Sequence, residues 1–275
     1  MNEEIFCRMA PSLGELEGTP LEAWGTPEYE GDLDAPTVFF GLYGLSDFYT
    51  LWRHRGKKWI LWAGSDIRHF DSGYWLDQVG DIKLDPKALA KWINENCESW
   101  VENEIEQKVL QTQGIKSQVC PSFMGDLNKY EVEYKWSEVP KVYASVSGDD
   151  FNLYRWDGVE KLAKENPDIE FHLYGNTKPW ESRSPNIVVH GRVKKHIMNA
   201  EIKKMQGGLR LLKFDGFSEI LAKSVLWGQY PVSAIEYPHM LPVEEISRLH
   251  AKHHWNAEGR NHYLGAINKF PWNQK

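Results

Sequence analysis

The sequence predicts an α/β protein of two lobes, each built on a parallel sheet flanked by helices. Short apolar segments ending in glycine alternate with helical segments in the second half, a pattern typical of a doubly wound sheet. The first half also contains short apolar strand-like segments and helical segments, in a less regular order. The length of 275 residues suits two modest lobes. Both lobes are therefore expected to be Rossmann-like.

Composition limits the class of protein. Acidic residues outnumber basic ones by 39 to 32, giving a net charge of −7, which argues against nucleic acid as a partner. No apolar run approaches the roughly 20 residues needed to span a bilayer, so no integral membrane segment is expected. The acidic N-terminus lacks the apolar region of a signal peptide. We therefore expect a soluble, cytoplasmic protein.

Cysteine and aromatic content add two expectations. Cys7, Cys97 and Cys120 are scattered and odd in number, which argues against a disulfide framework and fits a reducing compartment. The 13 tryptophans and 12 tyrosines suit either core filling or stacking on sugar rings. Core and interface filling is the favoured interpretation.

The first lobe is expected to span residues 1–135, and residues 1–35 form its mostly irregular lead-in. Expected strands are 36–41, 58–63 and 115–119, and expected helices are 46–53 with Ser46 as N-cap, 86–96 and 99–113 with Gly114 as C-cap. Residues 126–140 are polar and lack a clear period, so they are interpreted as the linker between the lobes.

The second lobe is expected to span residues 136–275. Expected strands are 141–147, 169–174, 186–190, 208–212 and 230–234, and expected helices are 156–166, 195–206 and 218–227, followed by one or two terminal helices after residue 243. Ligands of such a sheet bind beyond the carboxyl ends of the strands.

The loop from Lys213 to Ser218 is the most informative of those strand ends. Gly216 allows the backbone to approach a ligand closely, and Ser218 is suited to cap the following helix. The amides of Phe217, Ser218 and Glu219 would then form an anion site at the start of that helix. Asp-Gly is also a common turn sequence, so plain turn chemistry remains an alternative interpretation.

This loop belongs to a longer stretch with a family resemblance. Residues 208–233 resemble the donor-site signature of GT-B glycosyltransferases, most closely those of family four. Asp215-Gly216-Phe217-Ser218 matches its first part, and Pro231-Val232 matches its end. Segments 166–175 and 186–193 resemble the second and third strands of that lobe. The resemblance covers roughly residues 140–240.

The N-terminal half resembles the family's acceptor lobe more weakly, and beside the larger lobe typical of that family it is expected to be reduced. Residues 62–67 resemble its strand-end motif, and the glycine-rich segment that ends at Gly44 is the nearest counterpart of its first loop. Gly44, Gly64 and Ser65 are therefore acceptor-side candidates. Asp66 is the candidate catalytic residue, as a base or as a group that positions the acceptor hydroxyl. A helix N-cap role for Asp66 is an equal alternative.

The resemblance implies transfer of a sugar from a nucleotide-sugar donor to a carbohydrate or another hydroxyl acceptor. It implies no metal and no further cofactor, because helix amides and basic side chains would stabilise the leaving diphosphate. Retention of anomeric configuration is implied by family analogy alone. The donor-binding candidates are Gly148, Arg155, Gly175, Arg192, Lys213, Asp215, Gly216, Phe217, Ser218, Glu219 and Lys223.

One departure from the family pattern concerns the donor ribose. Lys223 stands where the family carries a second glutamate, and an ammonium group cannot accept hydrogen bonds from a vicinal diol. Glu219 is a possible replacement. The departure keeps a second hypothesis open, a non-catalytic relative that binds a nucleotide or glycan; a third is a sugar-nucleotide epimerase. The donor sugar, the nucleotide, the acceptor and the oligomeric state are left open by the sequence.

Overall fold

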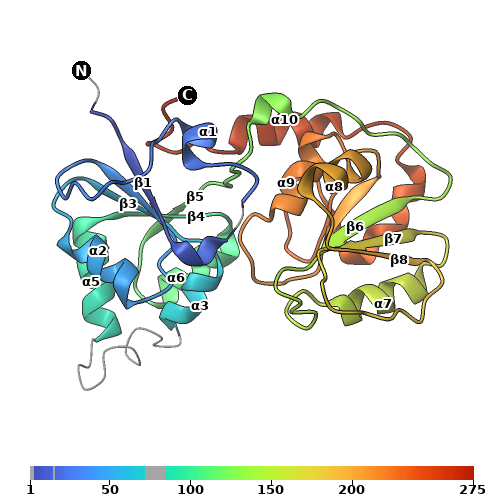
Figure 1. Cartoon of the computed structure of the whole chain (residues 1–275), viewed down its shortest axis with the longest axis horizontal. Helices are drawn as coiled ribbons and strands as arrows, with labels where there is room; N and C mark the ends of the chain where they lie inside the picture. Colours follow the sequence, from blue (N-terminus) through green and yellow to red (C-terminus); the bar gives the residue numbers. More distant parts are fainter. Residues whose placement is uncertain (1–2, 15, 72–84) are drawn as a thin grey trace. The chain divides into compact units, whose positions relative to one another are not determined.

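The computed structural model describes residues 3–14, 16–71 and 85–275, and it divides into two compact units (Figure 1). Unit 1 comprises Met1–Asp126, Phe214–Phe217 and Ala266–Lys275, and unit 2 comprises Leu127–Lys213 and Ser218–Gly265. The expected boundary between residues 135 and 136 therefore falls inside unit 2. The last ten residues, expected in the second lobe, belong to unit 1.

Unit 1 is a parallel five-stranded sheet flanked by helices. The strand order is β1-β2-β3-β4-β5, with all four pairings parallel. The strands are β1 (Phe6–Met9), β2 (Thr37–Phe40), β3 (Lys58–Leu61), β4 (Glu98–Val101) and β5 (Ser117–Val119). The helices are α1 (Pro20–Trp24), α2 (Leu45–Arg53), α3 (Ser65–Asp71), α5 (Pro86–Asn96) and α6 (Glu104–Thr112), with a short 3-10 helix η1 (Pro11–Leu13).

Most of the described lead-in is irregular, as expected, although it also contains β1, η1 and α1. Two other expectations for this half are corrected by the structure. The helix expected over 99–113 begins only at Glu104, since the preceding residues pair with β3 as strand β4. Ser46 does not cap α2, because Gly44 is the N-cap and the Asp47 carboxylate accepts from the Gly44 amide at 3.0 Å. The strand at 98–101 formed because pairing with β3 outweighed the local helical pattern.

The two faces of this sheet are both packed with apolar side chains. Alternate residues of β2 point to opposite faces, so Phe39 lies in one core cluster while Val38 and Phe40 lie in the other. The second cluster contains Trp24 and Trp272, which are fully buried with ring centroids 5.9 Å apart. Core filling is thus the role of these tryptophans.

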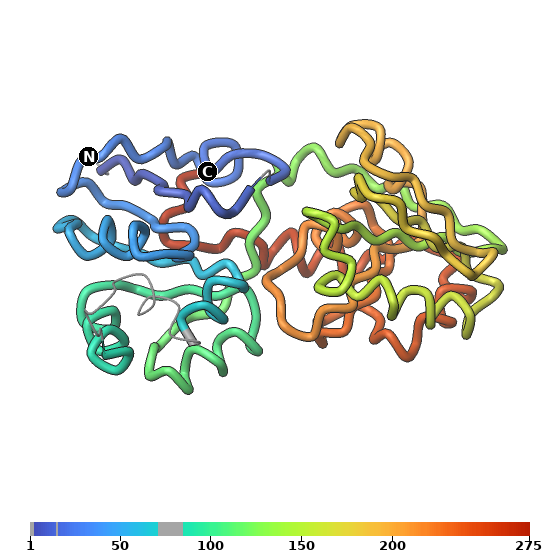
Figure 2. The backbone as a smooth tube through the Cα atoms, turned by 60° about the horizontal axis from the view of Figure 1, so that its bottom comes forward, coloured from blue at the N-terminus to red at the C-terminus, as the bar shows by residue number. Residues whose placement is uncertain are grey.

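The C-terminal segment completes that second cluster. Phe270 stacks on Trp272 with centroids 4.4 Å apart, and the Gln274 amide donates to the Trp24 carbonyl at 2.8 Å. Figures 1 and 2 both show the end of the chain beside α1. These contacts are why the last ten residues belong to unit 1.

Unit 2 is a parallel six-stranded sheet in the order β11-β10-β9-β6-β7-β8. The strands are β6 (Lys141–Ser145), β7 (Glu170–Tyr174), β8 (Ile187–Gly191), β9 (Gly207–Arg210), β10 (Val232–Ser233) and β11 (Leu241–Pro242). The helices are α7 (Trp156–Glu165), α8 (Lys195–Ile202), α9 (Glu219–Leu226) and α10 (Ala257–Ala266), with the 3-10 helices η2 (Leu127–Lys129) and η3 (Val243–Ala251). The predicted alternation of strand and helix is confirmed here, and β11 is an addition to it.

The chain reverses its direction of winding at β6. It proceeds from β6 to β7 and β8 on one side, then returns to place β9 on the other side of β6. In open parallel sheets, ligands bind at such a switch point, beyond the carboxyl ends of the two strands. The loops after β6 and β9 therefore lie where a ligand is expected to bind. Within the described ranges, no helix is long and apolar enough to cross a bilayer.

Candidate functional site

The donor-side candidates of unit 2 lie at one edge of its sheet. Gly148 follows β6, Gly175 follows β7, Arg192 follows β8 and Lys213 follows β9. All these strands are parallel, so their carboxyl ends share that edge. Residues widely separated in sequence are thereby placed on one side of the unit.

The loops after β6 and β7 are fixed to one another. Gly175 has φ +96°, and a Cβ there would collide with the Val146 carbonyl oxygen, so only glycine suits this position. The Asp149 carboxylate accepts from the amides of Thr177 and Lys178 at 2.6 and 3.2 Å. The hydrogen bonds from Thr177 lower the pKa of Asp149 below its usual range.

The loops at the switch point carry Arg155 and Ser218. Arg155 is the N-cap of α7 in a left-handed conformation, φ +58°, and its side chain is 53% exposed. Its Nε lies 3.6 Å from Asp157 Oδ1. Ser218 is the N-cap of α9, as predicted, and its Oγ accepts from the Ile220 amide at 3.3 Å. Glu219 begins the helix and is partly buried.

Lys223 lies in the interior of unit 2. Its side chain is only 2% exposed, and its Nζ is 3.4 Å from Asn199 Oδ1. A buried ammonium group is costly unless it is hydrogen-bonded, so this contact supports the lysine in place. In this conformation Lys223 presents almost no surface to a ligand.

The Phe214–Phe217 loop joins β9 to α9 but packs within unit 1. The Arg68 guanidinium donates to the Phe214 carbonyl at 3.3 Å, and the Asn103 amide group donates to the Asp215 carbonyl at 2.7 Å. The Phe217 amide donates to Glu102 Oε2 at 2.8 Å. One of the three amides expected to face an anion therefore binds a carboxyl group of the protein.

Glu102 belongs to a group of three buried carboxyls at the carboxyl edge of the unit 1 sheet. Burial raises the pKa of Glu102 to about 8 and the pKa of Asp66 to about 7. Burial, followed by the neighbouring Glu102 charge, raises the pKa of Glu106 well above its usual range. Glu106 is fully buried, and its Oε2 accepts from the Glu102 amide at 2.9 Å.

Asp66 is fully buried and holds backbone in place. Its carboxyl oxygens accept from the amides of Leu42, Ala63 and Ile67 at 2.9, 3.0 and 2.8 Å. These bonds connect the loop after β2 with the start of α3. Both oxygens are thus occupied by amides, which is the geometry of a structural acceptor.

The acceptor-side glycines and Ser65 lie around the same edge. Ser65 Oγ donates to the Tyr43 hydroxyl at 3.2 Å. Gly44 precedes α2 as its N-cap. Gly64 has φ +79°, and a Cβ added there would lie 2.9 Å from the Gly216 amide nitrogen. The structure thereby brings together two glycines that the sequence analysis assigned to opposite sides of the reaction.

Sequence reasoning missed Glu102, Asn103 and Glu106. The expected helix over 99–113 placed all three in its interior, whereas Glu102 and Asn103 lie between β4 and α6 and Glu106 lies in the first turn of α6. A signal was present, because an asparagine followed three residues later by glutamate is typical of a helix start. The Asn103 side chain does accept from the amides of Ile105 and Glu106.

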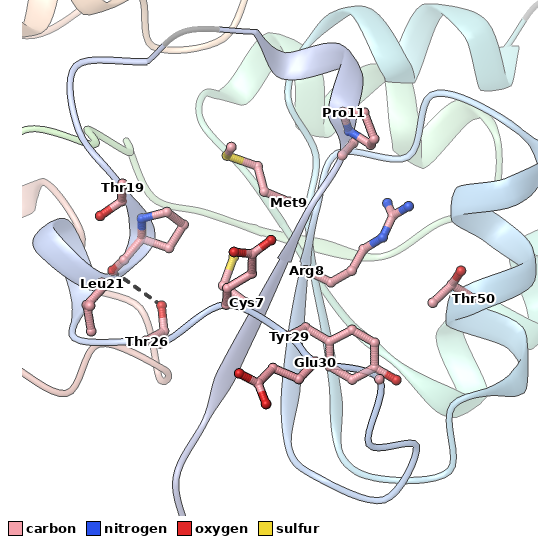
Figure 3. A pocket seen from close by; sticks show the side chains of 14 residues that line it. Cys7, Arg8, Met9, Pro11, Thr19, Leu21, Thr26, Tyr29, Glu30 and Thr50 are labelled. Carbon is pink, nitrogen blue, oxygen red and sulfur yellow. Dashed lines mark hydrogen bonds between the residues drawn. The ribbon is translucent and has the colours of Figure 1, made fainter.

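A separate pocket of about 810 Å³ lies along strand β1 (Figure 3). Two of its polar side chains already bind the protein: Arg8 pairs with Asp47 at 2.5 Å, and Thr26 donates to the Pro20 carbonyl at 3.3 Å. None of the sequence-predicted site residues lines it. Among the residues that the structure describes, no group of three or more His, Cys, Asp or Glu side chains is arranged to hold a metal.

The fold is shared with several solved structures at low sequence identity. The lipopolysaccharide outer core galactosyltransferase WaaB matches 86% of this chain with 10% identity and a TM-score of 0.58, over 73% of its own length. HepE from Anabaena, solved with UDP and glucose, matches 86% of this chain with 11% identity and a TM-score of 0.53, over 75% of its own length. TarM matches 83% of this chain with 14% identity and a TM-score of 0.54.

The chain spans about half the length of TarM, since the match covers 51% of that protein. No protein-family model matches the sequence, and no curated protein is significantly similar to it in sequence. The likeness is therefore one of architecture. With two parallel α/β units and these matches, the chain has the fold of the GT-B glycosyltransferases.

Proposed function

We propose that this protein is a nucleotide-sugar-dependent glycosyltransferase that moves a sugar to a carbohydrate or another hydroxyl acceptor. The observation that carries the proposal is the Asp215-Gly216-Phe217-Ser218 sequence between β9 and a capped α9, at the switch point of a GT-B fold. Ligand binding at this point of a parallel sheet has a physical basis, because loop amides and helix N-termini converge there.

The donor diphosphate would bind at the start of α9. Helix amides and the positive end of the helix dipole stabilise an anion at this place. Lys213 adds positive charge beside it, and Arg155 and Arg192 add charge at the same edge of the sheet. As the bond to the sugar breaks, negative charge grows on the leaving phosphate oxygens, and these fixed donors stabilise it without a metal.

A UDP-sugar is the first donor to test. HepE is described with UDP and glucose, and WaaB is described as a galactosyltransferase. These likenesses concern architecture, so other nucleotides belong in the same screen. The acceptor hydroxyl would be held by unit 1, where Gly44, Gly64 and Ser65 lie at the carboxyl edge of the sheet.

A non-catalytic protein that binds a nucleotide or glycan is the second candidate function. It is favoured by Lys223, which replaces the family glutamate and is 2% exposed. It is also favoured by the Phe217 amide, which binds Glu102 instead of remaining available to a phosphate. Such a protein would bind the donor or its nucleotide without transferring the sugar.

Calorimetric titration with UDP, UDP-glucose, UDP-galactose, GDP and ADP tests the proposal. We expect one nucleotide class to bind, and Lys213→Ala to weaken its binding about tenfold, about 1.4 kcal/mol, through loss of a phosphate contact. Lys161→Ala is the matched control, because Lys161 is an exposed lysine that pairs with Glu165 on α7. Sugar release or transfer from the bound donor then separates the enzyme from the binding protein. Absence of binding by every nucleotide would refute the glycosyltransferase and the nucleotide-binding form of the second candidate.

A further inference from the structure

The Phe214–Phe217 loop is held at both ends and in the middle by unit 1. Arg68, from α3, binds the Phe214 carbonyl, and Asn103, which caps α6, binds the Asp215 carbonyl. Glu102, which directly follows β4, binds the Phe217 amide. Three hydrogen bonds over four residues leave the loop backbone little freedom. The chain then continues directly into Ser218, the N-cap of α9.

Glu102 is the centre of this arrangement. It is 8% exposed, its Oε2 accepts from Phe217, and its Oε1 accepts from the Ser122 hydroxyl. Ser122 follows β5, so the Glu102 carboxyl joins the loop to the ends of two strands of the sheet. Gly216 is pressed against the same carboxyl, because a Cβ at that position would collide with Glu102 Oε2.

We propose that Glu102 is a positioning residue, whose carboxyl sets the conformation of the Phe214–Phe217 loop by binding the Phe217 amide. An effect of Glu102 on donor binding rests on the function proposed above. An effect of Glu102 on the order of the loop is independent of that function, because it depends on hydrogen bonds within unit 1. Glu102 acts on the loop backbone and need not touch the substrate.

The second carboxyl, Glu106, makes the arrangement sensitive to protonation. Its Oε1 is buried and has no hydrogen-bond partner among the described residues, an arrangement that is costly for an ionised carboxylate. Burial beside Glu102 therefore favours the protonated form of Glu106. The titratable groups that interact with the pair from the surrounding elements are Tyr43, Asp66, Cys120 and Asp215; Arg68 lies beside Tyr43, and Lys269 lies beside Cys120.

The direction of the pH effect follows from these groups. Burial raises the pKa of Glu102 from its usual 4.5 to about 8, so the carboxyl stays protonated in the closed loop over a range where it would ionise in water. In the closed loop the ionised form is desolvated and is repelled by Asp215. We therefore expect the order of the loop to decrease as the pH rises from about 5 to about 8 and to level off above pH 8.

Amide hydrogen exchange measures the order of the Phe214–Phe217 loop directly, and it needs no ligand. The exchange rate at Phe217, corrected for the intrinsic effect of pH, is compared with the rates of β3 amides in the wild type and in variants. Glu102→Ala removes the acceptor, and we expect exchange at Phe217 to rise at least tenfold while β3 stays protected. Glu104→Ala, an exposed neighbour on α6, is the matched control and should behave as the wild type.

Glu102→Gln supplies a test that does not depend on the alanine variant folding. Its amide oxygen can accept from Phe217 and its amide nitrogen can donate to Ser122, but it cannot ionise. We expect its protection at Phe217 to stay constant between pH 5 and pH 8, while that of the wild type falls over the same range. Exchange at Phe217 that stays slow in Glu102→Ala would overturn the proposal. So would exchange that rises equally in β3, or a pH dependence shared by the glutamine variant.

Nucleotide titration of the same variants tests the link to the donor. Glu102→Ala should weaken nucleotide binding at least tenfold at pH 6.5, whereas Glu102→Gln should restore it to within about threefold of the wild type. If no nucleotide binds the wild type but the exchange results hold, the proposed function fails and the positioning role stands. If a nucleotide binds all variants equally, the proposed function stands and the link to Glu102 is refuted.

Discussion

At the scale of single residues, Gly216 is required by a close contact and not by a left-handed backbone conformation. Its φ is not among the positive values of the described chain, so an alanine would not strain the backbone. The obstacle is the Glu102 carboxyl, which occupies the space that a Cβ would take. The glycine therefore serves a contact within unit 1, in addition to any close approach of a ligand.

Gly216→Ala is expected to destabilise the protein by about 1–3 kcal/mol through overpacking against Glu102. In the double variant with Glu102→Ala, most of that penalty should vanish because the obstructing carboxyl is gone. Urea unfolding of the four proteins measures the coupling. Gly265→Ala is the matched control, because nothing lies within 4 Å of the added Cβ and its φ is not in the left-handed region. Simple additivity of the two substitutions would contradict the contact described here.

At the scale of elements, helix α9 combines a capped start with a buried interior. Ser218 satisfies the Ile220 amide at one end, and all residues from Ile220 to Leu226 are buried. Lys223 sits in the middle of this buried stretch beside Asn199. The family resemblance places a glutamate at that position, whereas here the buried side chain is a lysine whose Nζ contacts Asn199.

Lys223→Glu is therefore expected to destabilise the protein by about 2 kcal/mol or more, since a buried carboxylate would face Asn199 without a positive partner. Lys223→Met keeps a similar volume without charge and should cost less. Thermal unfolding of both variants beside the wild type measures the difference. A glutamate variant as stable as the methionine variant, with nucleotide affinity raised, would indicate that the side chain can turn outward to a ligand.

At the scale of the whole molecule, the chain leaves unit 1, builds unit 2 and then returns. The return places Phe270 and Trp272 in the aromatic cluster around Trp24. Trp272 is fully buried and also lies 5.7 Å from Trp100 and 6.1 Å from Trp59, measured between ring centroids. One core of unit 1 thus depends on residues from both ends of the sequence.

Trp272→Ala is expected to cost about 3–5 kcal/mol of stability, because it removes a fully buried indole from that cluster. Trp255→Ala provides the comparison, since Trp255 is 40% exposed in unit 2. Calorimetric unfolding should show the transition of unit 1 lowered by the first substitution and left nearly unchanged by the second. Equal effects would contradict the assignment of the C-terminal segment to unit 1.

The sequence by itself determined the parts of this protein that depend on local pattern. Buried strands such as 141–145 and 170–174 are indicated by apolar runs followed by a glycine, and Ser218 indicates a helix start. The α/β class and the strand-end loops were therefore predictable. The motif at Asp215–Ser218 was also visible, because it occupies four consecutive residues. These features need only the chemistry of neighbouring residues.

The tertiary structure alone decided which side chains meet. Glu102 contacts Phe217 across 115 positions, and Gln274 contacts Trp24 across 250, so no local period reports either contact. The local pattern predicted a helix that includes most of segment 98–101, yet this segment pairs with β3 as a strand. Glu102 and Asn103 therefore lie at the carboxyl end of that strand, before α6 begins. Burial then raised the pKa of Glu102 to about 8, because desolvation depends on what surrounds a group in space.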